Sequence, residues 1–160
     1  TGSTGAGASP KAATHHPERF TNLKAYKVLQ HQHVPEILAF LGGLGTAPDL
    51  AFVPLSAPVD RGILATCFVP CSAEVDEAAV LADAYAEHPL IRLRSGSPEL
   101  RLVRGTAFAD LAAFRQGDTV AVLCAIDNLG RGAAAQAVQA LELALDLSGP
   151  SPLRAAPLVP

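Results

Sequence analysis

Two histidines one residue apart are the strongest chemical feature of this sequence. His31 and His33 flank Gln32 at the end of a segment with the alternation of a strand. Residues two apart on a strand point to the same side, so both rings could face one pocket. The pair could move protons in an acid–base reaction, or it could bind a metal with Glu36 as a third ligand. It could equally be a half-exposed pair without chemistry.

Three other features could bind an anion or an amide. The opening segment, Thr1-Gly-Ser-Thr-Gly-Ala-Gly7, has small residues that let backbone N–H groups approach a phosphate. It is not a P-loop, because no Gly-Lys-Ser/Thr follows, and no strand precedes it as a dinucleotide fingerprint requires. Arg61 could hold a carboxylate or phosphate through two hydrogen bonds, or it could be solvated. Asn128 could pair with a carboxamide, or it could cap the helix that follows.

The cysteines predict neither a nucleophile nor a disulfide framework. Their number, three, is odd. Cys67 and Cys124 fall in apolar segments, where a thiol is normally an inert core group, and Cys71 follows a proline and is expected to be more exposed. The first twenty residues have no secretory pattern, so we expect a cytoplasmic protein.

The elements that position these residues predict an α+β fold. Neighbouring strands joined by short turns favour an antiparallel or mixed sheet with helices packed on one face. Strands are expected over 24–31, 50–55, 62–69, 90–94, 99–103, 108–115 and 119–126. Helices are expected over 35–41, 76–88 and 132–147. Residues 1–21 are predicted as a glycine-rich opening segment, and 148–160 as an extended Pro-rich end.

Length and charge exclude several classes of protein. The 160 residues suit one domain, and 49% apolar with 17% charged residues is a globular balance. Twelve basic against 15 acidic residues give a net charge of -3, which argues against nucleic-acid binding. The longest apolar run, Val120–Ile126, is too short to span a membrane. The absence of methionine, even at position 1, indicates a chain processed or cut from something longer.

Four segments in order resemble one enzyme family. They are Thr1–Gly7, His31-Gln-His-Val-Pro-Glu-Ile37, Arg61-Gly-Ile-Leu-Ala-Thr66 and the stretch from Ala125 to Gln139 that contains Asp-Asn-Leu-Gly-Arg-Gly. This order resembles the N-acetyl-gamma-glutamyl-phosphate reductases of arginine biosynthesis. It is also similar to their relatives in lysine biosynthesis, which reduce a carrier-bound aminoadipyl phosphate. The resemblance implies a fold like the C-terminal domain of glyceraldehyde-3-phosphate dehydrogenase.

The resemblance implies that residues 1–160 are the semialdehyde-dehydrogenase-type catalytic and dimerisation domain. In that family an N-terminal NADP-binding domain comes first, and the catalytic cysteine lies near the junction, upstream of the segment that opens this chain. We therefore expect this chain alone to be inactive. The implied cofactor is NADPH, the implied substrate is a small acyl phosphate, and the implied assembly is a dimer or tetramer. A non-catalytic interaction module is the alternative from another class.

The family's acid–base residues map onto the histidine segment. By resemblance, His33 activates the thiol and protonates the developing oxyanion, with His31 in reserve. Glu36 would orient the imidazole. The family implies no metal at this position.

The remaining site residues also follow from the resemblance. Arg61 would hold the anionic substrate, and Asn128 would position the nicotinamide. Gly5 and Gly7 would line the loop around the substrate phosphate.

Four positions depart from the family's usual pattern. The family commonly has arginine and threonine where this chain has Gln32 and Val34. Many members have histidine at the position of Leu55, and a polar residue at that of Ala107. These departures leave the fold prediction intact and bear on which acyl substrate is used.

Overall fold

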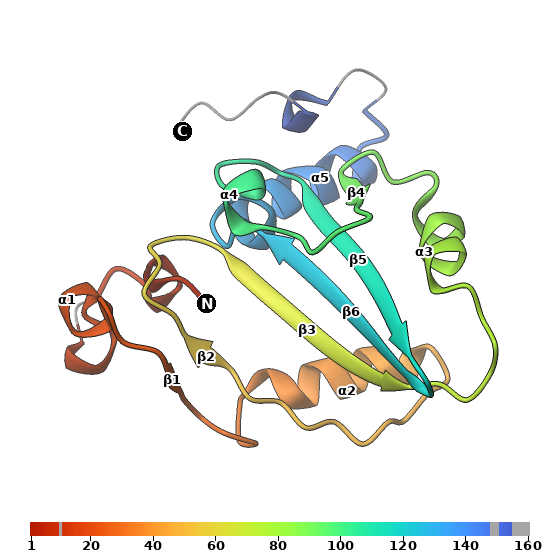
Figure 1. The fold of residues 1–160 in the computed structure, drawn as a ribbon. Helices are drawn as coiled ribbons and strands as arrows, with labels where there is room; N and C mark the ends of the chain where they lie inside the picture. Colours follow the sequence, from red (N-terminus) through yellow and green to blue (C-terminus); the bar gives the residue numbers. More distant parts are fainter. Residues whose placement is uncertain (10, 148–150, 155–160) are drawn as a thin grey trace.

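Two β-sheets frame the molecule in the computed structural model, which describes residues 1–9, 11–147 and 151–154. The larger sheet has the strand order β3-β6-β5-β4 (Figure 1). Its strands are β3 (Ile63–Pro70), β6 (Thr119–Ile126), β5 (Ala109–Gln116) and β4 (Ile91–Leu93). β6 is antiparallel to both β3 and β5, whereas β4 is parallel to β5, which confirms the mixed sheet. The smaller sheet pairs β1 (Lys24–Ala25) with β2 (Leu55–Ser56).

The β5–β6 hairpin is the best-predicted part of the sheet. The pairing of Gln116 with Thr119 closes it, and β6 has the predicted bounds. Gly117 lies at φ 56°, in the left-handed region where glycine carries no steric penalty. The turn residues therefore set the register of both strands.

Helices occupy the connections and both ends of the chain. They are α1 (His16–Arg19), α2 (His33–Gly43), α3 (Glu77–Tyr85), α4 (Leu100–Val103) and α5 (Ala135–Ala144), with a π-helical turn over Gly130–Ala134 and 3₁₀ turns over Ser3–Ala6, Ala12–Thr14 and Pro152–Arg154. Asp76 caps α3 as predicted, because its Oδ1 accepts from the N–H groups of Ala78 and Ala79 at 3.0 and 2.9 Å.

Two predicted strands are much shorter in the structure. The strand over 24–31 ends at Ala25, because Lys27 and Leu29 adopt positive φ and turn the chain. The strand over 50–55 is reduced to Leu55–Ser56, because Pro54 has no N–H for a regular ladder.

Two further predictions of secondary structure were wrong. Residues 99–103 were predicted as a strand but contain α4, whose Leu100 side chain packs against Gly62. The opening segment 1–21, predicted as loop, contains short helical turns. At the other end, the structure describes only 151–154 of the Pro-rich segment, so its prediction as extended otherwise lies outside the described residues.

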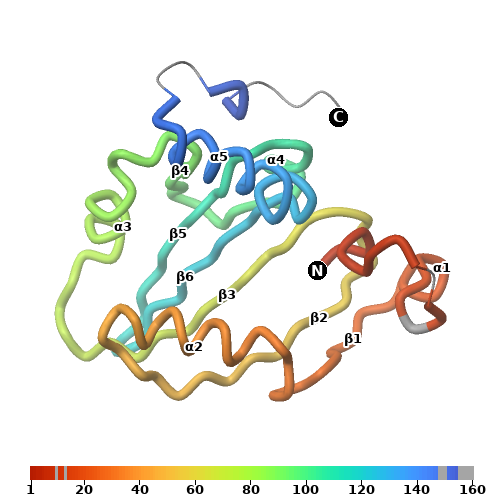
Figure 2. The backbone as a smooth tube through the Cα atoms, turned by 180° about the vertical axis from the view of Figure 1, so that it is seen from behind, coloured from red at the N-terminus to blue at the C-terminus, as the bar shows by residue number. Residues whose placement is uncertain are grey.

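One side of the large sheet is left open. Figures 1 and 2 show α2 and α5 on the same side of the strands, while α4 covers only one end of the other side. The register places Leu64, Phe68, Leu123 and Phe114 on that other side, and we call these four residues the open face. Phe68 is 73% exposed there. The fold thus leaves β3 exposed along most of its length and presents an apolar surface of the sheet to solvent.

Candidate active site

The strand register brings Arg61 and Gly62 next to Asp127 and Asn128, which are distant in the sequence. Ile63 at the start of β3 lies opposite Ile126 at the end of β6. The residues just before Ile63 are therefore neighbours of those just after Ile126. Gly62 donates its N–H to Asn128 Oδ1 at 2.7 Å. The opening segment lies beside them, because Gly2 donates to the Gly62 carbonyl at 2.8 Å. Three segments therefore converge at one end of the sheet.

Asp127 ties this end together. Its fully buried carboxylate accepts hydrogen bonds from Arg61 Nη2 and from the backbone N–H groups of Gly105, Leu129 and Gly130, at 2.9, 2.6, 2.9 and 2.7 Å. Burial by itself would raise the pKa of Asp127, but these donors outweigh it and hold the pKa below its ordinary value. The carboxylate is therefore ionised and fixes the turn that presents Asn128.

The Asn128 amide is held in one orientation. Its Nδ2 donates to Thr4 Oγ1 at 3.0 Å, while its Oδ1 accepts from Gly62. Thr4 in turn donates its hydroxyl to the Asp60 carbonyl at 2.7 Å. An amide nitrogen has two hydrogens, so one N–H of Asn128 remains for a ligand.

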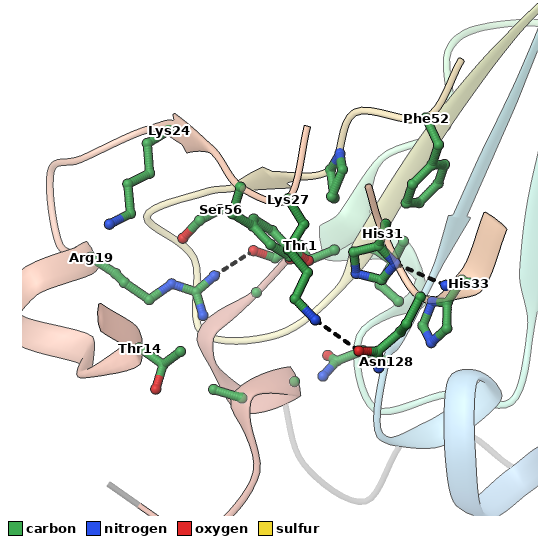
Figure 3. Close-up of a pocket in the computed structure, with 17 residues that line it drawn as sticks. Thr1, Thr14, Arg19, Lys24, Lys27, His31, His33, Phe52, Ser56 and Asn128 are labelled. Atoms are coloured by element: carbon green, nitrogen blue, oxygen red, sulfur yellow. Dashed lines mark hydrogen bonds between the residues drawn. The ribbon is translucent and has the colours of Figure 1, made fainter. Parts of the chain in front are cut away.

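A cavity of about 740 Å³ opens beside this junction. Figure 3 shows His31, His33 and Asn128 on its walls, with Phe52 close to the histidines. The structure thus brings both predicted histidines and the predicted amide to one cavity. Gly5 also lines it.

His31 is packed tightly in the cavity wall. It is 9% exposed, and its ring centroid lies 5.8 Å from that of Tyr26 and 5.2 Å from that of Phe52. Its Nδ1 accepts the backbone N–H of His33 at 3.3 Å. Burial lowers the pKa of His31, and the neighbouring His33 and Lys27 lower it further. A neutral ring whose Nδ1 accepts carries its proton on Nε2, so His31 is a hydrogen-bond donor there.

His33 is the more accessible of the two rings. It begins α2, is exposed, and lies with its ring centroid 4.6 Å from that of His31. Glu36, in the same helical turn, makes no hydrogen bond to either ring among the described residues. In the part of the chain that the structure describes, no three His, Cys, Asp or Glu side chains are grouped to hold a metal ion.

Arg61 and Gly7, like Glu36, do not line this cavity. Arg61 forms its ion pair with Asp127, and its buried Nε has no partner among the described residues. Gly7, at φ 83°, borders a smaller hollow of about 220 Å³ on the outer side of the opening segment. Their predicted substrate roles stay predictions.

None of the cysteines lies in the cavity wall. Cys67 is exposed, which differs from the core position expected of it, because β3 is exposed along nearly its whole length. Cys71 and Cys124 are half-buried, and burial raises the pKa of the Cys124 thiol. A raised pKa disfavours the reactive thiolate.

Sequence reasoning missed the cationic residues of the cavity. Arg19, Lys24 and Lys27 all line it, together with the ring of Tyr26. Three cations within nine residues, just before the histidines, were the available signal. The predictions of a loop over 1–21 and a strand over 24–31 did not bring these cations together at one site.

The fold and the cavity define a class: an α+β domain with a cavity lined by a histidine pair and a fixed amide. The chain belongs to the semialdehyde dehydrogenase dimerisation-domain family, whose profile matches residues 1–128. The family assignment agrees with the resemblance carried by the four segments.

Similar proteins with curated names cover nearly the whole chain. N-acetyl-gamma-glutamyl-phosphate reductase of Wolinella succinogenes is 42% identical over 147 residues, which are 91% of this chain and 44% of that protein. The reductase of the same name from Nitrosomonas eutropha is 39% identical, over 99% of this chain and 48% of its own. The chain thus spans about half the length of the curated relatives it matches.

One solved structure is similar to part of this chain. Aspartate semialdehyde dehydrogenase II from Vibrio cholerae superimposes with a TM-score of 0.49 and 22% identity, over 61% of this chain and 31% of that one. Among the described residues, no helix has the length and apolar character needed to cross a membrane.

Proposed function

We propose that this chain is the acid–base and dimerisation half of an NADPH-dependent reductase. The reductase converts N-acetyl-gamma-glutamyl phosphate to the semialdehyde in arginine biosynthesis, in the cytoplasm. The observation that carries the proposal is the cavity in which His31, His33 and Asn128 meet the glycine-rich opening segment. The names of the relatives support the same substrate.

In this proposal the nucleophile comes from outside the chain, on an N-terminal nucleotide-binding domain. A cysteine thiolate attacks the acyl carbon, phosphate leaves, and a thioester forms. NADPH, when bound, supplies the hydride that converts the thioester to the aldehyde and releases the thiolate.

His33 is the proposed acid–base residue. Its exposed ring can take the proton of the attacking thiol, and it can return a proton to the oxygen of the developing oxyanion. His31, neutral and with its proton on Nε2, can donate a hydrogen bond to the same oxygen. Glu36 remains the predicted orienting partner of His33.

The other residues bind and orient. The free N–H of Asn128 suits a carboxamide oxygen of the nicotinamide, so the residues present fit this part of the cofactor. Gly5 and Gly7 are proposed to flank the substrate phosphate. Arg61 is proposed to act on the anionic substrate from its position against Asp127.

The open face supports a homodimer or tetramer. Leu64, Phe68, Leu123 and Phe114 form an apolar surface of the sheet that a second copy could cover. Burial of such a surface is the usual driving force for association between identical subunits.

A reductase assay tests the proposal. The chain alone should give no NADPH-dependent reduction, and the protein with the N-terminal domain joined to it should reduce N-acetyl-gamma-glutamyl phosphate. A preference for a carrier-bound aminoadipyl phosphate would move the substrate to lysine biosynthesis. No turnover with either acyl phosphate would favour the non-catalytic interaction module.

A further inference from the structure

The cavity has a second polar end, away from the histidines. Figure 3 shows Arg19, Lys24, Thr14 and Ser56 grouped on one side, and His31, His33 and Asn128 on the other. Neither the predicted acid–base chemistry nor the predicted nicotinamide contact uses this cationic end.

The buried Arg19 guanidinium uses only part of its hydrogen-bonding capacity. It is only 6% exposed, and its Nη2 donates to the Thr1 carbonyl at 2.7 Å. Its Nε is buried without a hydrogen-bond partner, and no carboxylate of the described residues forms an ion pair with it. A buried guanidinium with an unused donor is costly unless a ligand completes it.

A second buried polar residue lines the same end of the cavity. Ser56 is 8% exposed and lines the cavity, and its hydroxyl makes no hydrogen bond with the described residues. The position of this residue is fixed by the small sheet, in which Ser56 is paired with Lys24. The same pairing places the lysine at the cationic end.

The charge of the cavity is one-sided. Within the ranges of the chain that the structure describes, its lining includes Arg19, Lys24 and Lys27, and no aspartate or glutamate. Lys27 is partly engaged, because its Nζ donates to Gln32 Oε1 at 2.7 Å. An arginine fork beside a hydroxyl matches the two oxygens of a carboxylate.

We infer that Arg19, assisted by Ser56 and Lys24, anchors a carboxylate of the substrate remote from its reacting acyl group. This inference rests on the proposed function for the identity of that substrate. The reacting end of an acyl phosphate must lie by the histidines and the glycine-rich segment, so the phosphate belongs there. The cationic end then takes the second anionic group, which for an N-acylated glutamyl phosphate is its α-carboxylate. Arg19 is thereby a specificity-determining residue: it selects acyl phosphates that carry a second carboxylate.

Binding of two matched probes to the 160-residue chain tests the inference without catalysis. N-acetyl-L-glutamine has the α-carboxylate and a neutral side-chain amide, and its α-amide derivative lacks the charge. Titration calorimetry or NMR should show that the chain binds the acid at least tenfold more tightly than the amide. Equal binding of the two probes by the unmodified chain would overturn the inference.

Variants locate the effect. Arg19→Gln should weaken binding of the acid about 10- to 100-fold, the usual effect of losing a charged hydrogen bond, and leave the amide probe unchanged. Arg19→Lys should retain part of the affinity. Arg101→Gln, which removes the same charge from an exposed side chain paired with Glu99, should change nothing. Circular dichroism checks that each variant is folded, and the probe comparison in the unmodified chain stands even if one is not.

Inorganic phosphate separates the two anionic groups. Its binding should be unaffected by Arg19→Gln, and a loss of phosphate binding with unchanged acid binding would contradict the assignment. In the protein with its N-terminal domain, Arg19→Gln should raise KM for the acyl phosphate about tenfold or more, with a much smaller change in kcat. Absence of reductase activity with intact Arg19-dependent probe binding would refute the proposed function alone. Activity with an unchanged KM would refute the carboxylate anchor alone.

Discussion

The two ends of the large sheet are built in opposite ways. Where β3 begins and β6 ends, Asp127 and Ala125 are fully buried; Asp127 accepts a hydrogen bond from Arg61, and Asn128 accepts one from Gly62. Near the other end of the same strands, Arg115 donates to the carbonyls of Gly117 and Cys71, but Phe68 is largely exposed. One end is organised around a buried carboxylate, and the other presents apolar surface to solvent.

This difference separates two tasks. The polar end must hold a few side chains in fixed positions, and the hydrogen bonds of Asp127 and Asn128 do so within this chain. The apolar end needs only a flat apolar surface, which a second copy of the chain can cover. Changes at the polar end should therefore alter chemistry and stability, and changes at the apolar end should alter association.

The largest effect is expected at His33. In the protein with its N-terminal domain, His33→Ala should lower kcat about 10²- to 10⁴-fold, the usual contribution of a general acid–base residue. Steady-state kinetics measures the change. His88→Ala, which removes an exposed histidine after α3, is the matched control and should have no effect. An unchanged rate in His33→Ala would move the role to His31 or remove it.

Asp127→Asn should strongly destabilise the polar end. The variant keeps the shape but loses the charge that pairs with Arg61, and one amide nitrogen would face backbone donors. We expect the free energy of unfolding to fall by about 3 kcal/mol in chemical denaturation. Asp118→Asn, in the hairpin turn, should shift it by less than about 0.5 kcal/mol. Equal effects of the two changes would show that the buried network contributes no special stability.

Phe68→Ser should affect association and not folding. Removing an exposed ring from the open face should weaken dimerisation about 10-fold or more, whereas the unfolding of the monomer changes little. Sedimentation across a range of concentrations measures the dissociation constant. Phe40→Ser removes an equally exposed ring, at 69%, from α2 and should leave the dimer intact. A chain that is monomeric at all concentrations would contradict the dimer role of the open face.

The smallest expected effect is a pH dependence. The pKa of Asp127 is lower in the folded chain than the unfolded value of about 3.9, so the unfolded state binds the proton more readily. The stability from its ionised form is fully present above about pH 4 and is lost as the pH falls through the folded pKa. Denaturation between neutral pH and about pH 3 should therefore show an acid-dependent loss of stability that is smaller in Asp127→Asn. An identical loss in both proteins would assign it to other groups.

Local signals in the sequence predicted the parts of the fold that depend on short-range contacts. The turn at Gly117 predicted the β5–β6 hairpin, and Asp76 predicted the start of α3. The segment 99–103 was missed because its alternation suits a strand, whereas Leu100 is held in a helical turn by contact with Gly62, which is distant in the sequence. Tertiary contacts of this kind leave no local trace.

The candidate site divides in the same way. The histidine pair and Asn128 could be found because their spacing and order are distinctive. Arg19 and Ser56 could not, since their importance follows from burial beside the cavity and from unused hydrogen bonds. The role of Asp127 could not be predicted, because a carboxylate next to an asparagine gives no sign that four donors surround it.

The claim that this chain builds its half of the site unaided is tested most directly by NMR of the imidazole nitrogens. In the 160-residue chain, His31 should have its proton on Nε2 and titrate below the ordinary histidine pKa, as its contacts with the His33 N–H and the surrounding rings require. Mixed tautomers and an ordinary pKa for His31 would contradict the claim, and would mean that the polar end forms only when the rest of the protein is present.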